Sequence, residues 1–226
     1  MPLRRFLSRR WLLAFLGGAA LLVGLAMLHP YPRQSLFGPT IRGKPWCVWE
    51  AAFRRQAHWE EYQETLDFRL RGWLGIRPSR QEWEFKHPEL APLLVHMTYD
   101  PDPAIRDEAI HYLHMVCHDR EVFQHIVPLA NHPDESVRVA AMFMMMNFRD
   151  RSLPILMEAL DDPAEDVRWQ AACQLEVLGP VAKEAIPALQ RRSRDESKEV
   201  QFIAARALQT IDPDRFHHLK SEREIE

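Results

Sequence analysis

The chain has 226 residues, of which 46% are apolar and 27% are charged, enough for one folded domain and a smaller extra segment. Its net charge of -3 and its isoelectric point near 6.4 provide no basic field of the kind that attracts nucleic acid. We therefore expect no nucleic-acid partner.

The chain begins with a basic segment followed by an uncharged one. Residues 1–10 contain four arginines and no acidic residue, and residues 11–28 carry no charge. Eighteen residues rise about 27 Å as a helix, close to the roughly 30 Å hydrocarbon core of a bilayer. Arginines ahead of such a segment favour a cytoplasmic N-terminus. We therefore expect a basic cytoplasmic N-terminus at 1–10 and a transmembrane signal anchor at 11–28.

This segment also fits two other export signals. Gly24, Leu25 and Ala26 offer small residues to a signal peptidase, and cleavage there would make the chain a secreted protein. The apolar regions of signal peptides usually have about 7–15 residues, which favours the retained anchor. The pair Arg9 and Arg10 also resembles a twin-arginine export signal. The anchor predicts a single-pass protein of the cell inner membrane with an extracytoplasmic C-terminal domain.

Residues 29–45 are rich in proline and glycine, which disfavour regular structure. We expect a linker here, partly stiffened by its prolines. Residues 46–87 begin with aromatic and charged side chains, and Trp46, Trp49 and Phe53 recur at helical spacing. We expect this region to be an aromatic N-terminal cap on the helices that follow, with an aromatic ligand platform as the alternative.

One pattern occurs four times between residues 88 and 215. Each copy has an apolar anchor residue, an alanine four positions later and a large apolar residue eight positions later, which fall on one stripe of a helix. An apolar segment with a proline precedes each anchor, so each copy predicts a helix, a short turn and a second helix. The anchors, spaced by 32, 30 and 33 residues, are Ile105, Val137, Val167 and Val200.

A helix pair that repeats with this period is typical of an α-solenoid. Asp-Pro before the second helix, Val-Arg opening it and Ala-Ala then Leu within it, best seen in 161–175, resemble the short HEAT-like repeats first named for phycobilisome lyases. The segment 43–46, followed by Trp49, resembles one found in membrane-anchored, exported bacterial HEAT-repeat proteins. The resemblance implies an all-α solenoid of about four HEAT-like helix pairs with an N-terminal transmembrane helix. Residues 216–226 are expected to be a charged tail.

An arginine follows three of the anchors directly, within the apolar stripe, where it needs an acceptor. We interpret these arginines as a structural ladder that joins each turn to its second helix, with anion binding as the alternative. The expected pairs are Asp100 with Arg106, Asp162 with Arg168, Asp195 facing Gln201, and His132 in place of the acid beside Arg138.

The positions two, six and nine after each anchor form a second stripe, which we call the outer row. Second helices line the concave side of HEAT-like solenoids, so the resemblance implies that the outer row borders a groove. Its members are Asp107, His111, His114, Val139, Phe143, Met146, Trp169, Cys173, Glu176, Phe202, Arg206 and Gln209. The row is apolar in its middle and polar at its ends. Part of it is expected to lie between neighbouring repeats, and any exposed part has the character of a partner site.

These features predict a membrane-anchored scaffold that binds a protein or peptide. The expected site consists of Phe143, Trp169, Phe202, Arg206 and Glu176. The sequence shows no Gly-rich phosphate loop, no paired-histidine protease helix and no serine elbow. We therefore expect no enzyme, no cofactor and no small-molecule substrate.

Two alternatives remain open. His111, His114 and His118 share one helical face at a spacing that suits a transition metal, which would indicate an exported metal- or haem-handling protein. A lyase-like enzyme is a third hypothesis, and it depends on the resemblance alone.

The chain has three cysteines, an odd number, in a compartment expected to be oxidising. We expect free thiols. Cys117 and Cys173 lie at helix positions predicted to be buried, so Cys47, beside the linker, is expected to be the most reactive.

Overall fold

The computed structural model describes residues 40–65, 69–70, 73 and 85–217, and most of these are helical. The chain divides into two compact units, Met1–Arg80 and Gln81–Glu226. Segment 11–28 lies outside the described residues. Among the residues that are described, no helix has the length and apolar character needed to cross a bilayer.

The first unit contains a short hairpin and two helices. Its elements are β1 (Thr40–Ile41), β2 (Lys44–Pro45), α3 (Trp46–Ala57) and α4 (Trp59–Gln63). β1 and β2 pair antiparallel, so the prediction of an irregular linker is wrong for residues 40–45. Arg42 and Gly43 both have positive φ, 52° and 75°, as the tight two-residue turns of hairpins require.

Trp49 of α3 holds the hairpin. Its indole N–H donates to the carbonyl of Ile41 at 2.9 Å, and the ammonium of Lys44 lies 4.5 Å from the centre of its ring. Cys47 is only 3% exposed, on a helix that also buries Trp49 and Phe53. This burial argues against the expectation that Cys47 is the most reactive cysteine, because its thiol is shielded from solvent.

The second unit consists of four successive helix pairs within residues 85–217. The first helices of the pairs and their 3-10 turns are η2 (Pro88–Leu90), α6 (Ala91–Met97), η3 (Arg120–Val122), α8 (Phe123–Ile126), η4 (Val127–Asn131), η5 (Met145–Ser152), α10 (Leu153–Ala159), η6 (Gly179–Ala185) and α12 (Ile186–Arg192). The second helices are α7 (Pro103–Val116), α9 (Glu135–Met144), α11 (Glu165–Leu178) and α13 (Lys198–Ile211), and α14 (Pro213–Phe216) follows them.

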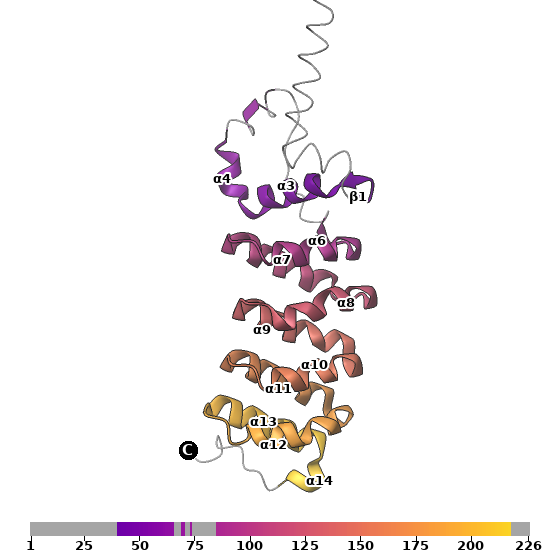
Figure 1. Ribbon diagram of the computed structural model, residues 1–226, viewed down its shortest axis with the longest axis vertical. Helices are drawn as coiled ribbons and strands as arrows, with labels where there is room; N and C mark the ends of the chain where they lie inside the picture. The colour runs from indigo at the N-terminus through magenta and orange to yellow at the C-terminus, as the bar shows by residue number, and fades with distance from the viewer. Residues whose placement is uncertain (1–39, 66–68, 71–72, 74–84, 218–226) are drawn as a thin grey trace, which may run out of the picture. The chain divides into compact units, whose positions relative to one another are not determined.

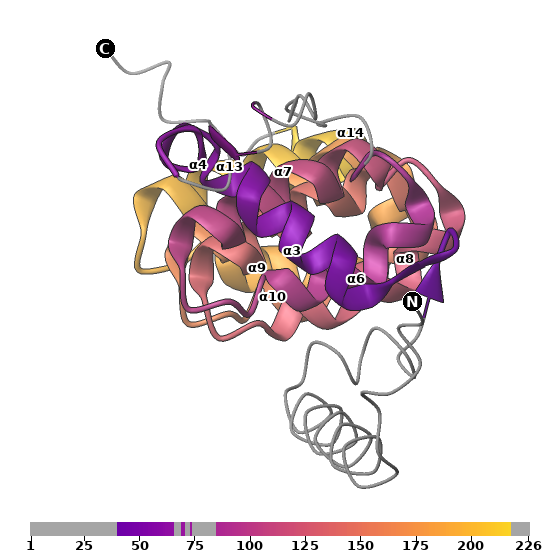
Figure 2. The same ribbon diagram turned by 90° about the horizontal axis from the view of Figure 1, so that it is seen from above.

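The pairs stack in chain order from α6 and α7 to α12 and α13 (Figure 1). Successive pairs lie over one another in the view down the stack (Figure 2). Each second helix contacts the second helix of the next pair. The prediction of a helical repeat solenoid in this part of the chain is confirmed.

The stripe predicted to form the core is buried. All four anchors are at most 2% exposed, the four alanines that follow them are fully buried, and the large apolar residues at the eighth position are at most 1% exposed. Alanine in the middle of the stripe permits close approach of neighbouring helices. Phe85 lies in the region expected to be a cap, but it belongs to the second unit. The centre of its ring is 5.4 Å from the centre of the ring of Tyr112 of α7.

The ends of the helices follow from their sequences. Asp102, Asp134 and Ser197 precede α7, α9 and α13, and the side chain of each accepts a backbone N–H from the first turn. Prolines lie in the first turn of α6, α10 and α12, where a missing N–H costs nothing. These local signals fix where each turn ends, and so they set the register of the second helices.

Candidate binding face and its supporting arginine ladder

Three arginines tie each turn to its own second helix. Nη1 of Arg106, Arg138 and Arg168 donates to two successive carbonyls of the turn, at 2.9–3.2 Å. In the last repeat, Nε2 of Gln201 donates to the carbonyl of Asp195 at 2.6 Å. The predicted link from turn to helix therefore exists. We call these four side chains and their partners the arginine ladder.

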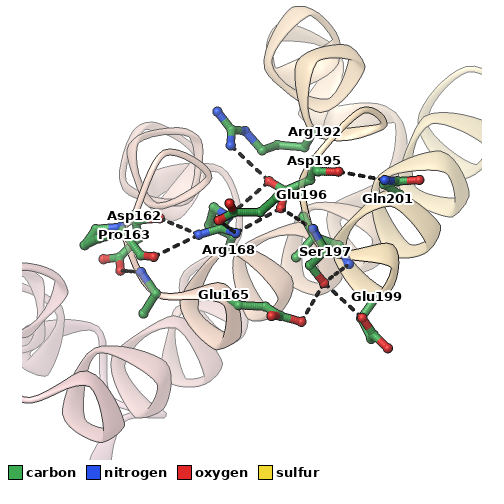
Figure 3. Close-up of polar contacts among 12 residues, drawn as sticks. Asp162, Pro163, Glu165, Arg168, Arg192, Asp195, Glu196, Ser197, Glu199 and Gln201 are labelled. Carbon is green, nitrogen blue, oxygen red and sulfur yellow. Dashed lines mark hydrogen bonds and ion pairs between the residues drawn. The ribbon is translucent and has the colours of Figure 1, made fainter.

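The charged partner of each arginine lies in the following repeat and not in its own turn. Arg106 Nε lies 3.2 Å from Asp134, and Arg138 makes two N–H···O bonds to Asp162, of 2.9 and 3.0 Å. Arg168 bonds Asp195 in the same way, at 3.1 and 2.9 Å (Figure 3). The guanidinium fork has enough donors to hold its own turn and the next turn together.

The expected pairs of Asp100 with Arg106 and of Asp162 with Arg168 do form, but through the backbone carbonyl of each aspartate and not through its carboxylate. The carboxylate of Asp162 accepts the N–H of Ala164 in its own turn and pairs with Arg138 of the preceding repeat. Because the guanidinium donors are used within the protein, the geometry favours the structural interpretation of the ladder over anion binding.

Burial of these pairs increases along the stack. In the first pair, the side chain of Arg106 is 23% exposed and that of Asp134 is 29% exposed. In the last pair, the side chain of Arg168 is 4% exposed and that of Asp195 is 1% exposed. Burial alone raises the pKa of Asp195, but hydrogen bonds from Arg168, the N–H of Ser197 and Arg192 lower it to about 2. The bond to Asp195 raises the pKa of Arg168, so both groups are charged at neutral pH.

His132 takes the place of the acid in the second repeat. Its Nδ1 accepts the N–H of Asp134 at 3.0 Å, as the carboxylate of Asp100 accepts the N–H of Asp102. Because a neutral imidazole gives Arg106 no carboxylate, the guanidinium pairs with Asp134 instead. The ring is 2% exposed and lies 4.1 Å from the ring of Tyr99. Burial lowers the pKa of His132.

The ladder supports the second helices, whose outer row is partly exposed. Phe143 of α9 is 47% exposed, and Trp169 of α11 is 40% exposed. Met146, one turn beyond Phe143, is 42% exposed. Single exposed apolar side chains are common on protein surfaces, whereas several of them in one row on neighbouring helices are typical of an interaction site.

The other predicted site residues form a small cluster where α11 meets α13. Arg206 and Glu176 form an ion pair of 2.7 Å, and the guanidinium of Arg206 lies 5.5 Å from the ring of half-buried Phe202. Phe143 instead has the ring of His114 as a neighbour, with 5.3 Å between the centres. The structure thus brings Phe202, Arg206 and Glu176 together, while Phe143 belongs to the α7 side of the row.

The three histidines proposed as metal ligands do not form a cluster. His114 is half-buried, its Nδ1 lies 3.0 Å from the carbonyl of Ile110, and burial lowers its pKa. The rings of His111 and Tyr112 lie at 72° to one another with 5.4 Å between their centres, and His118 is exposed. Among the residues described by the structure, no group of three or more His, Cys, Asp or Glu side chains is arranged to hold a metal ion.

None of the three cysteines, all of which lie in the described part of the chain, forms a disulfide. Cys117 is 1% exposed, as predicted, whereas Cys173 in the outer row is only half-buried. Burial, together with the negative charge of Glu176, raises the pKa of Cys173 to about 11, and Arg206 counteracts this in part. A thiol of this kind is a weak nucleophile at neutral pH.

A protein-family model described as HEAT repeats matches residues 123–209. No curated protein sequence matches the chain. One similar solved structure is an engineered protein, with 20% identity, coverage of 54% of this chain and 62% of that chain, and a TM-score of 0.40.

Two other solved structures are similar. A designed armadillo repeat protein in complex with the peptide (KR)4 has 19% identity, coverage of 58% and 74%, and a TM-score of 0.42. The complex of CpcE and CpcF of phycocyanin lyase from Nostoc sp. PCC7120 has 20% identity, coverage of 79% and 68%, and a TM-score of 0.47. These likenesses are too distant to carry an argument about activity, including lyase activity.

Proposed function

From the premise that residues 123–209 are HEAT repeats, we propose that the protein is an interaction scaffold that binds a protein or peptide through its outer row. Phe143, Trp169 and Phe202 are the apolar anchors of this site, and Arg206 with Glu176 forms its polar end. The observation that carries the proposal is the exposure of Phe143 and Trp169, 47% and 40%, on neighbouring helices.

The arrangement suits binding because its support is rigid. Arg138 and Arg168 join each helix pair to the next, so α9, α11 and α13 keep their spacing without a partner. A rigid site loses little conformational entropy on binding. Full burial of one large apolar side chain contributes about 1.5–3 kcal/mol, and the exposed parts of Phe143 and Trp169 can each supply a share of this to a complex.

We also propose that residues 11–28 anchor this scaffold as a single-pass protein of the cell inner membrane, with the repeats outside the cytoplasm. The support is the sequence: four arginines within 1–10, followed by eighteen residues without charge. Protease added to sealed spheroplasts should digest the repeats of an anchored chain. Without protease, the anchored chain should stay in the membrane after alkaline extraction. Release by alkali, or a mature N-terminus beyond residue 26, would contradict the anchor.

The binding function is tested by capture with matched variants of the full chain. Trp169→Ala removes an anchor of the outer row, and Val177→Ala removes an exposed apolar side chain from the same helix outside the row. A partner held by the wild type and by Val177→Ala but lost by Trp169→Ala supports the function. A partner held equally by all three chains would overturn it, provided that circular dichroism shows the same melting curve for each.

A further inference from the structure

The outer row has an acidic border at the N-terminal ends of the second helices. We call it the acidic rim, and its members, all exposed, are Asp107, which also belongs to the row, and Glu135, Glu165, Asp166 and Glu199 beside the row. Lys198 is the basic residue among them. The rim extends over α7, α9, α11 and α13, so it accompanies the outer row across the whole stack.

The spacing of the residues places the rim on the same side of the helices as the row. Glu165 lies four residues before Trp169, and Asp166 lies three residues before it, so all three share one helical face. Glu135 precedes Phe143 by eight residues and lies about 12 Å from it along α9. A ligand seated on Trp169 therefore has carboxylates beside it, and one that runs from Phe143 toward the start of α9 meets Glu135.

Some of the rim has a structural explanation. The carboxylates of Glu165 and Glu199 both accept from the hydroxyl of Ser197, and acidic residues stabilise helix N-termini in general. Asp107, Glu135 and Asp166 form no ion pair within the described part of the chain. These three carboxylates carry the inference, because the packing of the stack does not use their charge.

The cations near the row do not balance this charge. Arg206 already pairs with Glu176, and burial lowers the pKa of His114, which keeps its ring neutral at pH 7. Lys198 lies at the far end of the stack, on α13. The side of α9 and α11 that exposes Phe143 and Trp169 is therefore an apolar surface with a negative border.

We propose that the occupant of the outer row is an extended, basic segment of a partner protein. Two large apolar side chains of the segment lie on Phe143 and Trp169, and Lys or Arg side chains between or beside them face Glu135, Asp166 and Asp107. This inference rests on the proposed function, and it adds the chemistry of the partner.

The spacing of the helices sets the spacing of residues in the segment. Neighbouring packed helices lie about 8–10 Å apart, and an extended chain in the polyproline II conformation advances about 3.1 Å per residue with three residues per turn, so every third side chain faces the same way. The two apolar residues should therefore be about three positions apart. A segment of about nine residues would cross the stack from α7 to α13.

The test is an unbiased peptide selection on the full chain. A phage-displayed library of random dodecapeptides is selected on the immobilised chain, and enriched peptides are synthesised with a fluorescein label. Their affinities are measured by fluorescence polarisation for the wild type, Trp169→Ala and the rim variant Glu135→Gln/Asp166→Asn. Asp150→Asn, an exposed acid in η5 outside the rim, is the control.

We expect the enriched peptides to be basic, with two large apolar residues about three positions apart. Trp169→Ala should weaken their binding by about 10-fold or more, as removal of a central aromatic anchor does. The rim variant should weaken binding by about 5-fold at low salt and reduce its salt dependence, because both effects come from charge. Asp150→Asn should bind like the wild type.

Three results would overturn the inference. Neutral or acidic peptides that Trp169→Ala still weakens would refute the basic partner and leave the scaffold function standing. Basic peptides that the rim variant binds as tightly as the wild type would also refute it. Peptides unaffected by Trp169→Ala would refute both this inference and the proposed function.

Discussion

Arg168 and Asp195 are 27 residues apart in the sequence and are joined by two N–H···O bonds of 3.1 and 2.9 Å in the buried interior of the stack. Arg168 also donates to the carbonyls of Asp162 and Pro163, so a single side chain connects its own turn, its own helix and the turn of the next repeat. The stack is therefore held together by buried charges as well as by apolar contact.

Removal of Arg168 should destabilise the chain strongly. Arg168→Ala leaves the carboxylate of Asp195, 1% exposed, without its main partner, and loss of one member of a buried pair costs about 3 kcal/mol or more. Arg106→Ala removes an ion pair whose two side chains are 23% and 29% exposed. It should therefore lower the free energy of unfolding by less than about 1 kcal/mol. Urea unfolding followed by circular dichroism gives both values. Equal losses for the two variants would contradict the role of burial.

The same pair predicts sensitivity to acid. The pKa of Asp195 is about 2 in the folded chain and 3.8 ordinarily, so its ionised form stabilises the fold by about 2 kcal/mol above pH 4. This contribution should be lost as the pH falls from about 4 to 2. In Arg168→Ala the main group that lowers the pKa of Asp195 is missing, so this loss between pH 4 and pH 2 should be smaller than in the wild type. Thermal melting between pH 6 and pH 2 tests this, and identical profiles would contradict it.

His132 predicts a second pH effect at higher pH. Burial lowers its pKa from 6.5, so the unfolded chain takes up the proton first. The free energy of unfolding therefore has its full value above pH 6.5, and it declines as the pH falls below 6.5. The groups that face the ring are Tyr99, Asp134 and Arg106.

His132→Asn isolates this effect from that of other histidines. The amide oxygen of asparagine can accept the N–H of Asp134 as Asp100 accepts the N–H of Asp102, but it does not titrate. The variant should lose less stability than the wild type between pH 7 and pH 5. A wild-type decline as shallow as that of the variant would show that His132 contributes nothing to it.

Local periodicity was sufficient to predict the helix pairs, because burial of Ile105, Ala109 and Leu113 is dictated by a repeat of 3.6 residues. The partner of Arg168 was not predictable in this way. The offset between stacked repeats places the carboxylate of Asp195 beside Arg168. The spacing in the sequence instead indicates Asp162, the acid in the same turn. The hairpin at Arg42 and Gly43 was missed because Arg-Gly is a weaker turn signal than Asn-Gly. Among the site residues, position in the row was predictable, but exposure depended on the packing of each neighbour.

Arg149 is strained in a conformation that suits glycine. Its φ and ψ are 49° and -125°, and Gly179, at the same position of the next repeat, has 59° and -136°. Such a conformation costs a side-chain-bearing residue about 1–3 kcal/mol. Arg149→Gly should therefore stabilise the chain by about 1 kcal/mol, after the entropy of the more flexible unfolded chain is allowed for.

Two further variants test whether the backbone causes this effect. Arg149→Ala keeps the strain and removes the charge, so its stability should remain close to that of the wild type. Gly179→Ala should lose about 1 kcal/mol through its backbone alone, because an added Cβ meets no atom within 4 Å. A gain for Arg149→Ala as large as that for Arg149→Gly would instead attribute the effect to the side chain.

Cys173 should react slowly although it is the most open of the three thiols. Burial and Glu176 raise its pKa to about 11 from an ordinary value of 9.0, which lowers the thiolate fraction at neutral pH by about 100-fold. Iodoacetamide at pH 7.4, followed by mass spectrometry of each cysteine, should show little modification of Cys173, and Cys47 and Cys117 should react only after unfolding. Glu176→Gln removes the negative charge and should accelerate modification of Cys173. An unchanged rate in this variant would show that burial alone sets the reactivity of the thiol.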